Sequence, residues 1–125
     1  MNDPPRPYTL AFEQRDEYLY VRVTAEGLDR ESAVDYIREI ADKCREQHCK
    51  RVMIERDIEH LLSHADFFFV CQQVADIMRG IRIAFINRKP AKNDVLAFAL
   101  LVLRNRGARA EIHESVGSAE RFLLR

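Results

Sequence analysis

Hydrophobic and polar residues alternate over two neighbouring stretches near the start of the chain, 8–13 (YTLAFE) and 17–25 (EYLYVRVTA). Such alternation is typical of strands with one buried face, and the short polar connection QRD between the stretches is typical of a β-hairpin. Shorter apolar stretches follow at 50–55, 81–87 and 109–114. The pattern therefore predicts five strands, of which the first two form an antiparallel hairpin.

Between these strands the apolar residues recur every three or four positions, which is the period of an amphipathic helix. Suitable capping residues stand at several of the expected ends, since Asp29 precedes the first helix and glycines follow the second and third. The expected helices run from Asp29 to about His48 (apolar face Ala33, Ile37, Ile40, Cys44), from about His64 to Arg79 before Gly80 (stripe Phe67, Val70, Val74, Ile77), from about Asp94 to Arg106 before Gly107, and over 118–124.

Strands and helices alternate after the hairpin, in the order ββαβαβαβα. Regular alternation with helices of this length implies right-handed crossovers and a mainly parallel sheet, so the fold class is α/β with about five strands and four helices. No internal repeat or linker interrupts residues 8–125, which are expected to form one domain. Residues 1–7 are rich in proline and are expected to form a flexible arm.

Charge and composition exclude several classes of protein. The chain has 20 basic and 20 acidic residues and a formal net charge of zero, which argues against binding of nucleic acid. The longest apolar run covers only 95–103, whereas a membrane-spanning helix needs about 20 residues. No secretory leader follows Met1, and Cys44, Cys49 and Cys71 suit reduced thiols better than a disulfide framework. We therefore expect a cytoplasmic protein without membrane insertion.

The order of the elements and three particular segments resemble a known fold family. The segments are KRVMIERDIEHLLSHADFFFV (50–70), GIRIAFIN (80–87) and FALLVLRNRGARAEIHES (98–115). About residues 8–124 resemble the STAS domain of anti-sigma-factor antagonists and, more closely, the SpoIIAA-like group of bacterial proteins. The resemblance implies a compact α/β domain that binds protein partners or small anionic ligands. It also implies a serine or threonine beside an aspartate just after the third strand, where phosphorylation by a partner kinase switches binding off.

This chain departs from that pattern after the third predicted strand. The strand ends in Glu55, which Arg56 and Asp57 follow, and the first hydroxyl comes only at Ser63. As an N-cap, Ser63 would accept a hydrogen bond from the backbone of the next helix, with Asp66 three residues later. As a phosphosite, it would place a phosphate at a helix N-terminus, which favours negative charge. The two roles do not exclude each other.

The loops at the C-terminal ends of parallel strands share one edge of the sheet, and ligands tend to bind at that edge. We call this edge the rim and expect it to comprise residues 26–29, 56–63, 87–94 and 114–117. Basic side chains beside helix N-termini can hold a phosphate, a carboxylate or an acidic partner surface, while a solvated turn with ordinary lysines is the alternative. The candidate partner- or anion-binding residues are Arg56, Asp57, Ser63, His64, Arg88, Lys89, Lys92 and Asn93.

A catalytic site is a weaker alternative. Ser63 with His60 or His64 as base and Asp57 as orienting group would form a hydrolase triad. The strained, glycine-flanked elbow that exposes a nucleophilic serine is missing, since Leu62 and His64 are the neighbours. We therefore expect no catalytic residue. The sequence also lacks a glycine-rich phosphate loop, and no cofactor is expected.

Metal binding would require residues from separate segments to converge. His60, His64, His113 and Glu114 would all have to meet, and solvated surface histidines are the simpler outcome. The segment 44–49 (CREQHC) offers two thiols and one histidine, without a second ligand pair further along the chain. No metal is expected.

Apolar residues in the second and third helices exceed what one sheet can cover. The third helix is apolar all round from Val95 to Leu103, and such a helix must be covered on more than one side. Phe68 and Phe69 lie off the apolar stripe of the second helix, so core packing and an exposed ring both remain open. A homodimer interface or a groove for a lipid-like ligand would use such a surface. Its candidate residues are Phe68, Phe69, Phe98, Leu101 and Val102.

Two functions are compatible with these patterns. The first is a non-enzymatic, STAS-like regulatory module that binds a protein partner, as an anti-sigma-factor antagonist does but without the usual phosphoserine position, and that forms a homodimer. The alternative is a carrier of a small apolar or amphipathic, lipid-like ligand. An enzyme would require Ser63, a histidine and an acid within hydrogen-bonding reach of one another.

Overall fold

The computed structural model describes residues 7–60, 62–88 and 93–125. Within these ranges the chain forms five strands and four helices, in the order that the hydrophobic pattern predicts. The strands are β1 (Thr9–Gln14), β2 (Leu19–Gly27), β3 (Arg51–His60), β4 (Arg82–Asn87) and β5 (Arg109–His113). The helices are α1 (Arg30–Glu46), α2 (His64–Ile77), α3 (Asn93–Asn105) and α4 (Val116–Leu123). The predicted arm, 1–7, lies outside the described residues except for Pro7.

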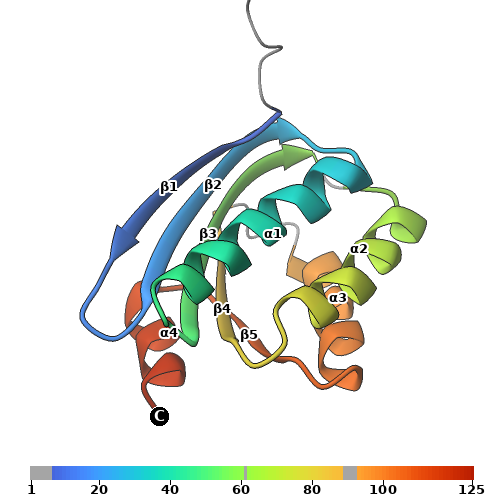
Figure 1. The fold of residues 1–125 in the computed structure, drawn as a ribbon. Helices are drawn as coiled ribbons and strands as arrows, with labels where there is room; N and C mark the ends of the chain where they lie inside the picture. The colour runs from blue at the N-terminus through green and yellow to red at the C-terminus, as the bar shows by residue number, and fades with distance from the viewer. Residues whose placement is uncertain (1–6, 61, 89–92) are drawn as a thin grey trace, which may run out of the picture.

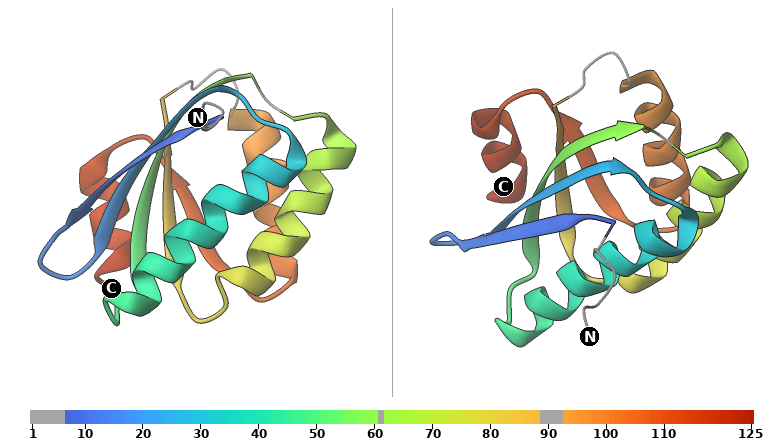
Figure 2. Two further views of the ribbon diagram at one scale, coloured as in Figure 1. Left: turned by 45° about the horizontal axis from the view of Figure 1, so that its top comes forward. Right: turned by 90° about the horizontal axis from the view of Figure 1, so that it is seen from above.

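The strands lie side by side in sequence order, β1-β2-β3-β4-β5 (Figure 1). β1 and β2 pair antiparallel, and every later pair is parallel. Because the order is sequential and crossovers between parallel strands are right-handed, α1, α2 and α3 must all lie on the same face of the sheet. Figure 2 shows this arrangement, with α4 on the opposite face. The predicted α/β fold and the order ββαβαβαβα are confirmed.

β3 is longer than the sequence predicts. The predicted strand 50–55 is wrong at its end, because β3 continues to His60. Its pairing with β2 also continues, as far as the pair formed by Gly27 and His60. The charged residues Arg56 and Asp57 therefore belong to a strand and not to a loop. Neighbouring residues of a strand point to opposite faces of the sheet, and this fact decides the geometry of the candidate site.

Each face of the sheet has its own core. Alternate residues of β3 point to the two faces, so Val52, Ile54 and Ile58 pack against α1, α2 and α3, while Met53 packs against α4. The smaller core under α4 consists of Tyr18, Met53, Ala84, Ile86, Ala119 and Leu123. α4 covers parts of β3, β4 and β5, and among the described helices none lies over β1 on that face of the sheet.

The cysteines form no disulfide. Cys44 lies on the buried side of α1 as predicted, Cys71 is buried on α2, and Cys49 follows α1 and is partly buried. Burial raises the pKa of Cys44 to about 12 and that of Cys71 to about 11, so both thiols stay protonated at neutral pH.

The helix ends follow the predicted capping residues. Asp29 Oδ1 accepts a hydrogen bond from the backbone N–H of Ser32 at 2.7 Å, which lowers the pKa of Asp29. After α2 and α3 the chain reverses through Gly80 (φ +84°) and Gly107 (φ +90°), a left-handed conformation that favours glycine. None of the described helices is both long and apolar enough to cross a membrane.

Candidate functional site

The rim lies where β2, β3 and β4 end and where α1, α2 and α3 begin. Arg56 and Asp57, which were expected to stand together on it, point to opposite faces of the sheet because they are neighbours in β3. Arg56 points toward the three helices, where it is buried, and Asp57 points to the other face. The predicted rim therefore divides into two separate groups of side chains, one on each face of the sheet.

On the face opposite the three helices, five polar residues form a connected group that we call the Glu55 network. Glu55 is buried, and its Oε2 accepts hydrogen bonds from Tyr20 Oη at 2.9 Å and from Arg88 Nη2 at 2.9 Å and Nε at 3.1 Å. Arg22 joins the group through its Nε, which lies 3.9 Å from Glu55 Oε2, and its Nη2 lies 3.0 Å from Asp57 Oδ2. The network thus joins β2 and β3 to the residue that follows β4.

Electrostatics in the Glu55 network keeps Tyr20 protonated and Arg88 charged. Burial, and then the hydrogen bond to Glu55, raises the pKa of Tyr20, so its hydroxyl keeps the proton that it donates. The hydrogen bond and the charge of Glu55 raise the pKa of Arg88. Half of the Arg88 side chain is exposed, so this arginine can contact a partner without leaving Glu55.

Ser63 is the N-cap of α2, as the spacing of Ser63 and Asp66 predicts. Its backbone is extended, and its Oγ accepts a hydrogen bond from the backbone N–H of Asp66 at 3.2 Å. Ser63 and His64 are both exposed at this end of the helix. Lys89 and Lys92 lie outside the described residues, and of Asn93 only the backbone, which begins α3, is described.

The hydrolase triad of the sequence analysis is not assembled. Among the described residues, no hydrogen bond joins Ser63 to His60, His64 or Asp57. His60 is four residues from Arg56 in β3 and shares its face, whereas Asp57 points the other way. The described residues also contain no group of three or more histidine, cysteine or acidic side chains placed to hold a metal ion.

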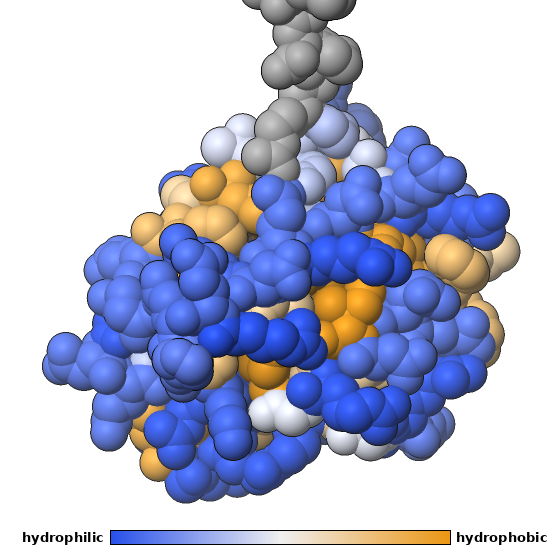
Figure 3. Space-filling view, viewed as in Figure 1, coloured by the Kyte–Doolittle hydropathy of each residue, from blue (hydrophilic) through white to orange (hydrophobic). Residues whose placement is uncertain are grey.

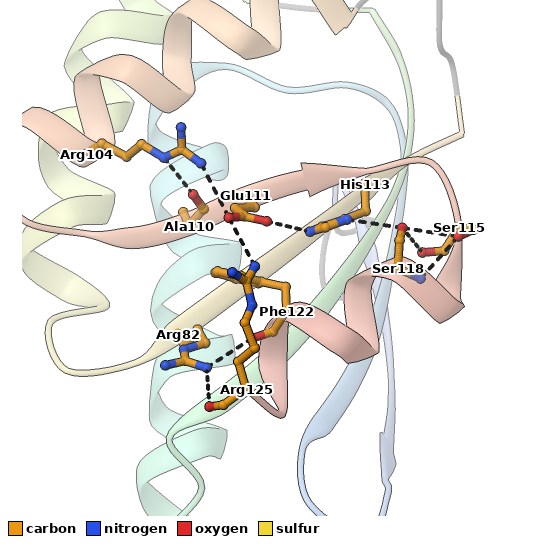
Figure 4. Close-up of polar contacts among 9 residues, drawn as sticks. All are labelled: Arg82, Arg104, Ala110, Glu111, His113, Ser115, Ser118, Phe122 and Arg125. Atoms are coloured by element: carbon orange, nitrogen blue, oxygen red, sulfur yellow. Dashed lines mark hydrogen bonds and ion pairs between the residues drawn. The ribbon is translucent and has the colours of Figure 1, made fainter.

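His113 does take part in a polar cluster, but with other partners (Figure 4). Its Nε2 lies 2.9 Å from Glu111 Oε1, and its Nδ1 lies 3.1 Å from Ser118 Oγ. A serine, a histidine and an acid are thus connected, yet the Ser118 hydroxyl donates to the backbone oxygen of Ser115 at 3.2 Å, within the first turn of α4. The cluster fixes the start of α4 on β5, which is a structural task.

The other end of α4 is fixed by an arginine. Arg82 Nη1 donates to the backbone oxygens of Phe122 at 3.0 Å, Leu123 at 3.2 Å and Arg125 at 3.1 Å (Figure 4). These carbonyls belong to the last turn of α4 and the residues after it, where an α-helix leaves its oxygens without partners. The contacts on β5 and β4 therefore hold both ends of the short helix.

The candidate apolar surface is largely exposed. Phe98 and Leu101 of α3 are 56% and 57% exposed, and Phe68 and Phe69 of α2 are also exposed. Val102 is partly buried and packs against the core. The ring of Phe69 lies under a guanidinium, since Arg30 Cζ is 4.6 Å from the ring centroid. The question left open for Phe68 and Phe69 is settled, because both rings reach the surface.

On the helix side, a cavity of about 70 Å³ lies between the sheet and α1, α2 and α3. We call it the Arg56 cavity. Its walls are mostly apolar and include Tyr36, Ile58, Phe67, Cys71, Phe85 and Leu100, while Arg56 and His60 are its basic members. Apolar side chains reach the surface between α1 and α2, with hydrophilic side chains on both sides of them, and further apolar areas lie elsewhere on this face (Figure 3). The cavity lies toward the rim end, because the first two turns of the three helices contribute to its wall.

Neither the Glu55 network nor the Arg56 cavity was predicted. The network joins residues up to 35 positions apart, and only the paired strands bring them together. The one local signal was polarity, since Glu55, Arg56 and Asp57 interrupt an apolar segment. Such an interruption is also typical of the end of a strand, so the segment was assigned to a loop.

Comparison with known proteins gives structural matches only. No family model and no curated protein sequence matches this chain. Its structure is similar to that of an anti-sigma factor antagonist from Mycobacterium paratuberculosis, with a TM-score of 0.67 and 13% identity over 99% of this chain and 100% of the other. It is also similar to an uncharacterized protein of the DUF3478 family with a SpoIIAA-like fold from Shewanella loihica PV-4, with a TM-score of 0.56 and 14% identity over 98% of each chain.

These matches define the class of fold. Both cover nearly the whole of this chain and of the other protein, so the likeness is not confined to a shared fragment. The chain has the SpoIIAA-like α/β fold, as its sequence pattern indicates. At 13% and 14% identity, the likeness establishes the fold and leaves function to the residues.

Proposed function

We propose that this chain is a non-enzymatic, STAS-like regulatory module of the cytoplasm that binds a protein partner along the rim. The observation that carries the proposal is the likeness, over the full length of both chains, to an anti-sigma factor antagonist. The polar groups for such an interface are Asp57 and Arg88 of the Glu55 network, Ser63, His64, and the neighbouring Lys89, Lys92 and Asn93.

The proposed interface has two parts, the arginine held by Glu55 and the N-terminus of α2. Arg88 is held by Glu55 and half of its side chain is exposed, so it offers donors in a defined position. Ser63 and His64 stand at the N-terminus of α2, where exposed backbone N–H groups attract negative charge. An acidic partner surface complements both parts. A phosphate on Ser63 would reverse the sign of the charge at this point and would weaken the same interface.

The partner-binding proposal predicts a loss of binding when the rim charge is reversed. The wild-type chain is expected to capture a partner from the host lysate. The double variant His64→Glu and Lys89→Glu is expected to recover at least about tenfold less of this partner, because the new negative charges repel its acidic surface. Ser63→Asp, which keeps a capping oxygen and adds a charge, is expected to weaken capture as well. Affinity purification with quantitative mass spectrometry measures the recovery.

Arg79→Glu is the matched control for this experiment. Arg79 is exposed just after the other end of α2 and forms a surface ion pair with Asp76. Its reversal changes the charge by two units far from the rim, compared with three units for the double variant. It is expected to leave recovery unchanged. If the rim variants and the control retain the same proteins in the same amounts, the rim is not the interface.

The proposed module also forms a homodimer through α3. Phe98 and Leu101 are more than half exposed, and a second copy of the same surface would cover them. Sedimentation equilibrium is expected to give about twice the mass of one chain for the wild type and a single-chain mass for the double variant Phe98→Ser and Leu101→Ser. Val116→Ser, an exposed position on α4, is the control and should stay dimeric. A wild-type chain that sediments as a monomer would exclude this interface.

The Arg56 cavity favours a second function, the binding of a small apolar or amphipathic ligand. Ligand sites in α/β sheets lie at the C-terminal ends of the strands, and the cavity is at that end. Its walls are mostly apolar with two basic side chains, a composition that is usual for small-molecule sites. Partner binding would use exposed groups at the rim and ligand binding the buried Arg56 cavity, so the two functions are compatible in one molecule.

A further inference from the structure

Arg56 occupies a position that the fold reserves for apolar side chains. It stands between Ile54 and Ile58 on the helix side of β3, and these two isoleucines are 0% and 3% exposed. Arg56 itself is only 9% exposed, and its Nε has no hydrogen-bond partner. Since arginine is almost never buried without a partner, this side chain requires an explanation.

No described residue supplies the missing negative charge. The acids beside Arg56 in sequence, Glu55 and Asp57, point to the other face, where they bind Arg88 and Arg22. The described residues that line the Arg56 cavity include no acidic side chain. Cys71, the nearest ionisable neighbour from α2, keeps its proton because burial raises its pKa to about 11.

Three helix N-termini add to the positive potential of the cavity. Ala33 of α1, Phe67 of α2 and Leu96 of α3 lie in the first two turns of their helices, and all three line the cavity. Each helix N-terminus carries a partial positive charge. A guanidinium beside three such termini is electrostatically unfavourable without an anion, and the same arrangement favours an anion strongly.

The size and the walls of the cavity limit the anion to a small amphipathic one. A water-sized group needs about 10–15 Å³ of such space, so 70 Å³ holds about five to seven non-hydrogen atoms. Apart from Arg56 and His60 the walls offer little polarity, which disfavours a phosphate with its many acceptors. An apolar tail, in contrast, suits Phe67, Phe85 and Leu100.

We propose that the Arg56 cavity binds a short-chain monocarboxylate of about four or five carbons, with its carboxylate paired side-on to Arg56 and its hydrocarbon tail packed among the apolar walls. The side-on pair uses the Nε and one Nη of the guanidinium, so it satisfies the Nε that lacks a partner. This inference rests on the ligand-binding function proposed above, because it names the class of that ligand.

Titration of the ¹⁵N-labelled full chain with butyrate at pH 7, followed by NMR, tests the proposal. 1-Butanol and butyramide serve as comparators with similar tails and no charge, and inorganic phosphate as an anion without a tail. Butyrate is expected to bind about ten to a hundred times more tightly than the uncharged comparators, which is the usual gain from a charged hydrogen bond. The shifted resonances are expected at Arg56, Cys71 and Phe67.

Substitution of Arg56 separates the contribution of the carboxylate to binding from that of the hydrocarbon tail. Arg56→Gln is expected to lose the preference for butyrate over butyramide, and Arg56→Lys to keep part of it, since lysine retains the charge without the planar fork. Arg38→Gln, at an exposed position of α1, is the control and should preserve the preference.

Two results would overturn the proposal in different ways. If butyrate and butyramide bind the wild type equally, the cavity takes ligands but not through a carboxylate, and the ligand-binding function stands without this inference. If neither compound nor 1-butanol shifts any resonance of the cavity, the ligand-binding function and the inference both fail. Both comparisons use the wild-type chain and do not depend on the folding of a variant.

Discussion

Replacement of Leu123 by alanine is expected to lower the free energy of unfolding by about 2–5 kcal/mol, the usual cost of emptying a fully buried leucine site. Leu123 is 0% exposed and lies in the small core under α4, together with Met53 and Ala84. Met53, Ala84 and Ile86 belong to paired strands, so the walls cannot easily collapse into the space. The helix would then depend on the contacts of Arg82 and His113 at its two ends.

Urea denaturation followed by circular dichroism measures this change. Leu124→Ala is the matched control, because Leu124 is the next residue and is 41% exposed; its effect is expected to stay within about 0.5 kcal/mol. Equal stability losses in the two variants would mean that α4 is not packed as the structure shows. A loss confined to Leu123→Ala would support the two-core arrangement.

The order of the elements was predictable because it depends on local periodicity. Ala33, Ile37, Ile40 and Cys44 recur at helical spacing, and all four are buried on α1. Alternation over 17–25 likewise marks β2, whose Leu19, Val21 and Val23 face the larger core. Sequential strand order with right-handed crossovers then leaves one arrangement for the three long helices.

The end of β3 was not predictable from local pattern. Glu55, Arg56 and Asp57 form a charged triplet, and charged triplets usually end a strand. The structure keeps them in the sheet because β2 is long enough to pair as far as His60, and because Glu55 and Asp57 meet arginines from other segments. Pairings over 33 and 35 positions depend on tertiary structure, which a single sequence does not reveal.

Only those parts of the candidate site that lie within a single helix or strand were predictable from the sequence. The N-cap at Ser63 follows from a serine with an aspartate three residues later, a relation within one helix turn. The separation of Arg56 from Asp57 depends on whether the segment is a strand or a loop, and the loop assignment placed them together. The Arg56 cavity depends on three helices and a sheet at once, and no motif in the sequence indicated it.

Arg56 provides the second large effect, because it is a buried charge whose Nε has no partner. Replacement by methionine, an unbranched and apolar side chain, is expected to raise the free energy of unfolding of the ligand-free chain by about 1–4 kcal/mol. Burial of a guanidinium without a counter-charge is costly, and the apolar walls can accept a methionine. Residues kept at a cost to stability are frequent at binding sites, so a gain on replacement would mark Arg56 as functional.

Urea denaturation with and without butyrate separates the two roles of Arg56. Without ligand, Arg56→Met is expected to be more stable than the wild type, while Arg38→Met, an exposed control on α1, should lie within about 0.5 kcal/mol of it. With butyrate, only chains that retain Arg56 should gain stability, and the gain should grow with ligand concentration. If Arg56→Met is instead less stable than the wild type, the guanidinium contributes to the fold and is not held for a ligand.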